Sequence, residues 1–272
     1  MTKKLDVFSM QIVANYLRNY TDFDNIICVC KKFEFILDRF RINPIMLTKE
    51  NKRLFKYIET QQIFYEDDED EFKIPDLMYQ YNYEVDYKRY LEEKKQFNIC
   101  KRVKYTRQNR REFGDEIPEG VNIIGEECFK KCKMTSFEVP STIHKINDGA
   151  FESCRQMTKI TIPDTVFEIW PSAFKQCRRL TSIQLPKSMK MLEDGIFAEC
   201  KFETFVIPST VTTIDSNCFQ LCHQLTRVVI ENAEEIGSSC FHDCKRLKEV
   251  VLPTNLTYKI GRSTRLNSSH VF

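Results

Sequence analysis

The stretch Ile146-Asn147-Asp148-Gly149-Ala150-Phe151-Glu152-Ser153-Cys154 is followed at fixed spacing by Met157, Ile160, Ile162 and Pro163, and it is the clearest copy of a motif that recurs between residues 117 and 261. Phenylalanine returns at positions 129, 151, 174, 197, 219 and 241, and a cysteine follows each one three residues later. A proline closes most copies, with Glu231 in place of the missing one. A period of 22 to 23 residues predicts a solenoid, in which each copy forms one coil.

Each copy divides into two short extended segments and a turn. Apolar residues that alternate with period two predict a strand with one buried face, and proline, which lacks an N–H donor, ends it. A second extended segment follows, and a turn of Gly, Asn, Asp or Ser then leads into the Phe and Cys. Stacked coils would lie about 4.8 Å apart, with Phe over Phe and Cys over Cys. The strand couplets are Phe137/Val139, Ile160/Ile162, Ile183/Leu185, Phe205/Ile207, Val228/Ile230 and Val250/Leu252.

The repeated wording Ile-Pro-x-x-Val-x-x-Ile-Gly-x-x-Ala-Phe-x-x-Cys-x-x-Leu-x-x-Val resembles the BspA-like leucine-rich repeats, also known as the Treponema type and expanded in amoebae such as Entamoeba. The resemblance covers residues 113–261 and implies an α/β repeat fold, a curved solenoid with short parallel strands. It also implies protein or surface recognition rather than catalysis.

Residues 1–45 read as a small domain of three short amphipathic helices, the first capped by Ser9 and the second by Thr21 or Asp22. The segments Met10–Leu17, Asp22–Asp24 and Val29–Phe33 resemble an F-box, although Asp6-Val7-Phe8 stands where that family has Leu-Pro. That resemblance implies an alternative function, a ubiquitin-ligase adaptor that docks a Skp1-type partner and selects substrates with its repeats.

Residues 46–112 form an irregular region that we expect to cap the open end of the repeats, since a solenoid needs a terminal cap. It should hold a helix through residues 48–58 and strands at 62–65 and 101–105. The tail, residues 262–272, breaks the repeat and resembles translated sequencing-adapter DNA. We therefore expect the natural chain to continue beyond Gly261 with further repeats and any lipidation motif.

The composition favours neither nucleic acid nor a bilayer interior. The net charge is +2, and no apolar run approaches the roughly 20 residues that a membrane helix needs. The first residues lack a secretory signal, and a column of buried thiols suits a reducing compartment. We expect a cytoplasmic protein, with the cell periphery or surface, reached by a non-classical route, as the alternative.

The sequence offers no catalytic, cofactor or metal site. Three cysteine pairs have a spacing that could suit zinc, but the repeat period already explains each pair. They are Cys128/Cys132, Cys218/Cys222 and Cys240/Cys244. Phosphate-binding loops and metalloprotease motifs are missing from the 272 residues. The sequence therefore predicts a protein that is not an enzyme.

Candidate partner-binding residues lie where the repeat leaves side chains exposed. Alternation along the strands places Arg227 and Glu249 in one outward column, and Val206, Val229 and Val251 in the next. An apolar stripe with charged edges fits a protein partner, although valine also simply favours strands. Trp170 occupies a turn position that is polar or Gly in other copies, where it either anchors a partner or covers a neighbouring repeat.

Overall fold

In the computed structural model, residues 7–29, 33, 35–68 and 73–253 are described. The chain divides into two compact units, residues 1–102 and residues 103–272. The expectations for the tail, for Gly261 and for part of the F-box-like segment fall outside the described residues.

The first unit begins with helices α1 (Val7–Ala14) and α2 (Tyr20–Val29). Asn19, rather than Thr21 or Asp22, caps α2, because its side-chain oxygen accepts from the backbone N–H of Asp22 at 2.9 Å. Ser9 lies inside α1, so its predicted capping role is wrong.

The third predicted helix and the one predicted over 48–58 are also wrong. The described residues of these two stretches form 3-10 turns rather than α-helices, among them η2 (Leu37–Arg39) and η3 (Lys52–Leu54). Irregular backbone is enough to bury the apolar side chains, and Phe23, Phe40 and Phe55 pack edge to face with ring centroids 5.4 to 6.2 Å apart.

The rest of this unit is built from strands and one helix. Strand β1 (Thr60–Ile63) pairs in parallel with β2 (Met78–Asp86), and the 3-10 turn η4 (Glu66–Asp68) lies between them in the sequence. Asp86 caps helix α4 (Tyr87–Lys95), and strand β3 (Ile99–Tyr105) continues into the second unit. The strand predicted at 101–105 is confirmed, whereas the one predicted at 62–65 begins earlier, at Thr60.

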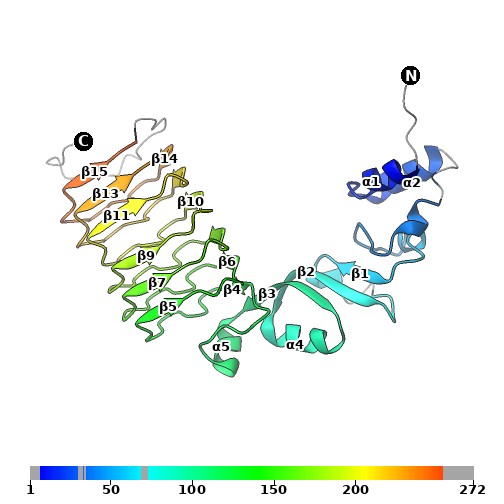
Figure 1. The fold of residues 1–272 in the computed structure, drawn as a ribbon, viewed down its shortest axis with the longest axis horizontal. Coiled ribbons are helices and arrows are strands. Elements are labelled where there is room, and N and C mark those ends of the chain that lie inside the picture. The colour runs from blue at the N-terminus through cyan, green and yellow to red at the C-terminus, as the bar shows by residue number, and fades with distance from the viewer. Residues whose placement is uncertain (1–6, 30–32, 34, 69–72, 254–272) are drawn as a thin grey trace, which may run out of the picture. The chain divides into compact units, whose positions relative to one another are not determined.

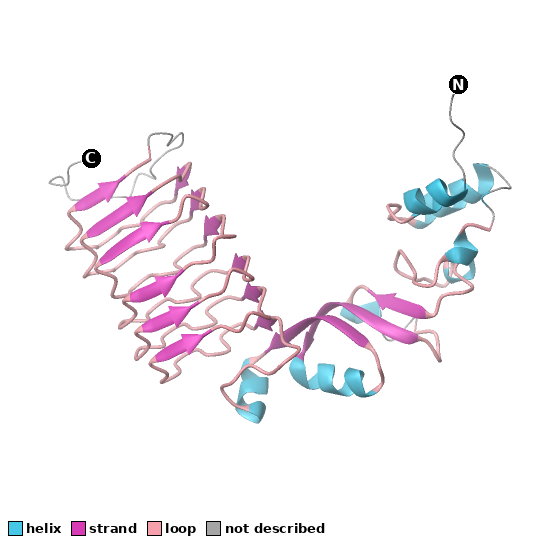
Figure 2. Cartoon of the chain, in the orientation of Figure 1, coloured by secondary structure: helices cyan, strands magenta, loops and turns pink. Residues whose placement is uncertain are grey.

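The second unit is the predicted solenoid, preceded by helix α5 (Arg107–Phe113). Each coil contributes a two-residue strand to a lateral stack and a longer strand to a second stack, the strand face (Figures 1 and 2). The lateral strands are β4 (Ile123–Ile124), β6 (Lys145–Ile146), β8 (Glu168–Ile169), β10 (Met191–Leu192), β12 (Thr213–Ile214) and β14 (Glu235–Ile236). The strand face holds β5 (Ser136–Glu138), β7 (Lys159–Thr161), β9 (Ser182–Gln184), β11 (Thr204–Ile207), β13 (Arg227–Ile230) and β15 (Glu249–Val251).

Phenylalanine and cysteine stack between these two sets of strands, as predicted. Consecutive repeat Phe rings lie with their centroids 5.2 to 5.8 Å apart. Each turn uses two residues with positive φ, one directly before the Cys and one two places before the Phe. Backbone bonds join neighbouring turns, for example from Phe151 N–H to the Ala173 carbonyl at 2.8 Å.

The repeat thiols link one coil to the next. Cys177 Sγ donates to the Phe151 carbonyl at 3.2 Å, and the other coils repeat this contact. The matching bonds run from Cys154 to Phe129, Cys200 to Phe174, Cys222 to Phe197 and Cys244 to Phe219, at 3.0 to 3.2 Å. The prediction of buried thiols in the repeats is therefore confirmed for these five cysteines.

Arg110, on helix α5, closes the first end of these columns. Its guanidinium lies 5.6 Å from the Phe129 ring centroid and donates to the Cys128 carbonyl at 2.9 Å. It also contacts the Cys132 thiol, and its Nε lies 3.2 Å from an Asp115 oxygen. The side chain thus supplies the donor and the flat apolar surface that a preceding coil would provide.

The strand stacks are interrupted at one junction between coils. Strand β8 does not pair with β10, nor β9 with β11, so the strand face consists of two three-stranded sheets. The turns at the same junction stay bonded, with Phe174 N–H donating to the Ile196 carbonyl at 3.1 Å and Lys201 N–H to the Leu180 carbonyl at 3.0 Å. The two coils therefore separate along their strands while the turn side holds them together.

Candidate functional site

The strand face presents the predicted apolar stripe. Register places Val206 beside Val229, and Val229 beside Val251, so the three side chains form one continuous row. Val206 is 56% exposed, Val251 36% exposed and Val229 half-buried. The preceding residues Phe205 and Val228 point to the other side of the sheet, where they are buried in the core.

The charged residues beside the stripe form a pair with each other. Arg227 Nε donates to a Glu249 oxygen at 2.8 Å, and both side chains are about half exposed. Surface pairs of this kind contribute roughly 0 to 1 kcal/mol to stability. Each member can therefore exchange its partner for an opposite charge on another protein at small cost.

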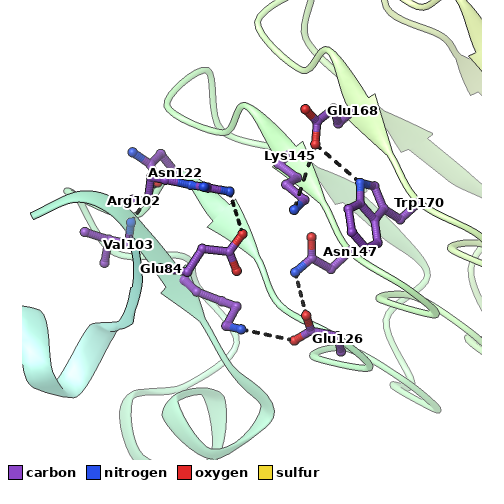
Figure 3. A network of polar contacts seen from close by, with 10 residues as sticks. Glu84, Arg102, Val103, Asn122, Glu126, Lys145, Asn147, Glu168 and Trp170 are labelled. Carbon is purple, nitrogen blue, oxygen red and sulfur yellow. Dashed lines mark hydrogen bonds and ion pairs between the residues drawn. The ribbon is translucent and has the colours of Figure 1, made fainter. Parts of the chain in front are cut away.

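Trp170 lies at the end of β8, on the lateral stack rather than on the strand face (Figure 3). Its indole is 39% exposed, and the Lys145 ammonium lies 4.0 Å from the ring centroid. The indole N–H donates to Glu168 at 3.3 Å, and the same carboxylate lies 3.9 Å from the Lys145 nitrogen. Trp170 thus covers a residue of the preceding coil and still exposes part of its ring.

Carboxylates accumulate beside Trp170. Glu126 accepts from the Asn147 side chain at 2.8 Å and lies 3.4 Å from the Lys104 ammonium (Figure 3). In the next coil, burial and the neighbouring Asp215 raise the pKa of Glu193. This lateral surface combines a partly exposed aromatic ring with carboxylates that are paired with Lys104 and Lys145.

The two candidate surfaces do not come together. The valine stripe belongs to strands β11, β13 and β15, whereas Trp170 follows a strand of the other stack. Sequence reasoning missed Lys145, which lies under the indole, and Lys201 and Phe202 at the interrupted junction. The sequence does carry a signal for the last two, since three residues separate Cys200 from Thr204, whereas four separate Cys177 from Ser182.

The thiols lie in an environment that keeps them protonated. Burial raises the pKa of Cys128 and of Cys244 to about 12, and it also raises the pKa of Cys200 and Cys222. A thiol in this state is a poor nucleophile and a poor metal ligand. Among the described residues, no cluster of three or more His, Cys, Asp or Glu could hold a metal ion.

Within the described part of the chain, no helix combines the length and apolar character that crossing a bilayer requires.

Comparisons with known proteins agree on the repeats. The sequence profile described as the BspA type leucine rich repeat region matches six copies, over residues 115–226 and 144–269. No curated protein matches the chain.

Among solved structures, a leucine-rich-repeat protein of Treponema pallidum is 27% identical, with a TM-score of 0.46, over 52% of this chain and 69% of that one. One from Bacteroides ovatus is 28% identical, with a TM-score of 0.40, over 50% of this chain and 42% of that one. A leucine-rich cell surface protein of Faecalibacterium prausnitzii is 17% identical, with a TM-score of 0.44, over 74% of this chain and 80% of that one.

Proposed function

Because the chain belongs to the family of BspA-type leucine-rich-repeat proteins, we propose that it is a non-enzymatic protein that binds another protein through its solenoid. Proteins built from such repeats are generally interaction or surface proteins. The observation that carries the proposal is the register of the valine stripe, Val206, Val229 and Val251. A row of partly exposed apolar side chains, bordered by the exchangeable pair Arg227 and Glu249, fits a protein interface with a polar rim.

Trp170 provides a second, separate candidate surface. Tryptophan is a favoured interface anchor, and here the Lys145 contact and the Glu168 bond hold its ring in one orientation. A fixed, partly exposed ring loses little conformational freedom on binding, which supports its use as an anchor.

A pull-down of partners with the full chain tests both surfaces. We expect the variant with Val206→Thr, Val229→Thr and Val251→Thr to lose the partner, because threonine keeps the strand shape and removes apolar surface. Trp170→Ser tests the lateral surface separately. Glu138→Gln, on the first strand of the same face, is the matched control and should retain binding. Unchanged partner recovery with both test variants would exclude both surfaces.

The alternative function is an F-box-like substrate adaptor that binds a Skp1-type partner. It is favoured by one observation, that helix α1 leaves Ile12, Val13 and Tyr16 at its end 49%, 41% and 78% exposed. Such a patch on a short helix suits a helical partner. Co-purification of the full chain with a Skp1-type protein tests this function, and we expect Ile12→Ser with Tyr16→Ser to abolish it. A chain that does not retain the Skp1-type protein at all would exclude the adaptor.

We further infer a cytoplasmic location from the reduced, buried thiols, with the cell periphery or surface as the alternative. We also propose that this chain is related to the amoebic members of the family, because its repeat motif resembles theirs. Fractionation of the source cells separates the two locations.

A further inference from the structure

The strands separate at the junction between β9 (Ser182–Gln184) and β11 (Thr204–Ile207). Strand β9 ends one three-stranded sheet, and strand β11 begins the next. The loop before β11 is one residue shorter than the loop before β9, and Phe202 stands in it where the neighbouring copy has Leu180. The Phe202 ring is buried and packs edge to face against Phe197 and Phe205, with centroids 5.6 and 4.8 Å away. The shorter loop and the larger side chain thus occur at the junction where β11 does not pair with β9.

A groove of about 240 Å³ occupies this junction on the strand face. Ile183 and Leu185 line one wall, and Phe205, Val206 and Pro208 line the other. Val206 is also the first residue of the valine stripe, so the groove opens directly onto that stripe. This end of the groove is apolar.

The other end of the groove is cationic. A second hollow, of about 430 Å³, shares Thr181 and Thr204 with the first and is lined by Lys201 and Arg246. The ammonium of Lys201 has no ion-pair partner in the part of the chain that the structure describes. It belongs to an exposed column in which a basic residue directly follows each repeat Cys: Lys133, Arg155, Arg178, Lys201, His223 and Lys245.

The groove also offers backbone hydrogen-bonding groups. Strands β7 and β13 pair with a neighbour on both sides, whereas β9 and β11 are edge strands that face this junction without a pairing strand. Open strand edges of this kind bind extended peptides, whose main chain pairs with the edge while alternate side chains enter pockets.

We propose that this groove binds an extended segment of a partner protein, with an acidic residue at Lys201 and an apolar residue beside Val206. A segment parallel to the neighbouring strands would carry its acidic residue toward its amino end, since Lys201 precedes β11 in the sequence. This inference rests on the proposed protein-binding function and deepens it, since Val206 belongs to both surfaces.

The charges favour a peptide over a nucleic acid. Glu203 lines the cationic hollow together with Lys201. Glu199, 2.6 Å from Arg178, lines a further hollow that Lys201 also borders. A polyanion with a charge on every unit would meet these carboxylates, whereas a peptide can place one acidic residue at Lys201 and neutral residues elsewhere.

Fluorescence anisotropy with labelled hexapeptides tests the proposal directly on the full chain. The probe is acetyl-Glu-Glu-Thr-Leu-Thr-Val, and the comparison peptide has Lys in place of both Glu residues. We expect the acidic peptide to bind at least tenfold more tightly, and added salt to weaken it. A single-stranded oligothymidylate of matched length tests the nucleic-acid alternative. Equal affinity for both peptides, or tighter binding of the oligothymidylate, would overturn the proposal.

Two variants locate the peptide. Lys201→Glu should weaken the acidic peptide about tenfold. The control Lys133→Glu, in the same column after the first repeat Cys, should not change its affinity. Inserting one alanine after Lys201 restores the loop length of the neighbouring copy, which should join the two sheets and abolish binding. Equal effects of Lys201→Glu and Lys133→Glu would overturn the site, whether or not the insertion folds.

A third variant separates this inference from the proposed function. Val229→Thr changes the stripe but does not line the groove, so it should leave peptide affinity unchanged. If the peptide binds as described while Val229→Thr with Val251→Thr still retains the natural partner, the stripe is wrong and the groove stands.

Discussion

Replacing Cys177 tests what the thiol column contributes to the solenoid. Its side chain is fully buried, and its Sγ donates to the Phe151 carbonyl at 3.2 Å. That carbonyl also accepts from the backbone N–H of Cys154 at 3.2 Å, so it keeps one partner when the thiol is removed. Cys177→Ala therefore removes a weak bond and one buried sulfur atom, and leaves no carbonyl without a donor.

The expected destabilisation by Cys177→Ala is the sum of the lost buried sulfur and the lost thiol hydrogen bond. Burying one heavy atom of apolar character contributes about 1 kcal/mol, and a thiol bond to an already satisfied carbonyl adds about 0.5 kcal/mol. A small unfilled cavity brings the expected destabilisation to about 1–2 kcal/mol. For a unit of this size, such a loss lowers the Tm by about 2–8 °C.

Urea unfolding followed by tryptophan fluorescence measures this loss of stability in the coil that contains Cys177, because Trp170, the only tryptophan of the sequence, lies in that coil. Cys177→Ser keeps a donor but not the apolar sulfur, so we expect it to cost about as much as Cys177→Ala. Cys28→Ala, at an exposed cysteine, is the matched control and should change stability by less than about 0.5 kcal/mol. Packing would be refuted as the main contribution of Cys177 to stability by one result: Cys177→Ser as stable as the wild type while Cys177→Ala loses more than about 2 kcal/mol.

Three further predictions concern the ends and turns of the repeats. Burial raises the pKa of Cys128 and Cys244 from 9.0 to about 12. The free energy of unfolding should therefore keep its full value below pH 9. It should fall as the pH rises from 9 toward 12, by about 1.4 kcal/mol per pH unit for each thiol, because only the unfolded chain loses these protons in that range. Urea midpoints at pH 8 and pH 10 check this, and Cys244→Ala should reduce the dependence. Arg110→Met keeps an apolar cover for the Phe129 ring but removes the donor to the Cys128 carbonyl, so it should cost about 1–3 kcal/mol and speed amide hydrogen exchange in the first coil. Leu221 has a φ of 61°, which asparagine tolerates better than leucine, so Leu221→Asn should raise the free energy of unfolding by about 0.5–1 kcal/mol in the same denaturant assay.

The repeats could be predicted from the sequence because the same local choices are repeated in every coil. The Phe and Cys positions fix one buried face, and the alternation of the couplets fixes which strand residues point outward. For this reason the exposed row from Val206 to Val251 and the partial exposure of Trp170 follow from the pattern alone. The contact of Trp170 with Lys145 does not follow, because it joins two outward positions of neighbouring coils.

The first unit was harder to predict, since no repeat constrains it there. The helix expected near residue 52 is a single 3-10 turn, although Phe55 is buried as an amphipathic pattern suggests. Burial of such residues can be achieved by several backbone conformations, and packing against Phe23 and Phe40 decides among them. A hydrophobic pattern therefore predicts which side chains are inside more reliably than it predicts short helices.

The departures from the repeat are where function should be sought, and two of them meet at one junction. Trp170 directly follows β8, the last lateral strand before the interruption, and the shortened loop with Lys201 leads into β11, the first face strand after it. A perfect repeat would pair every strand and leave only a uniform surface. Because the turns at this junction remain bonded while both strand stacks are open, the chain gains a groove without losing the Phe and Cys columns that hold its coils together. The same irregularity thus creates the groove and places the valine stripe at its mouth.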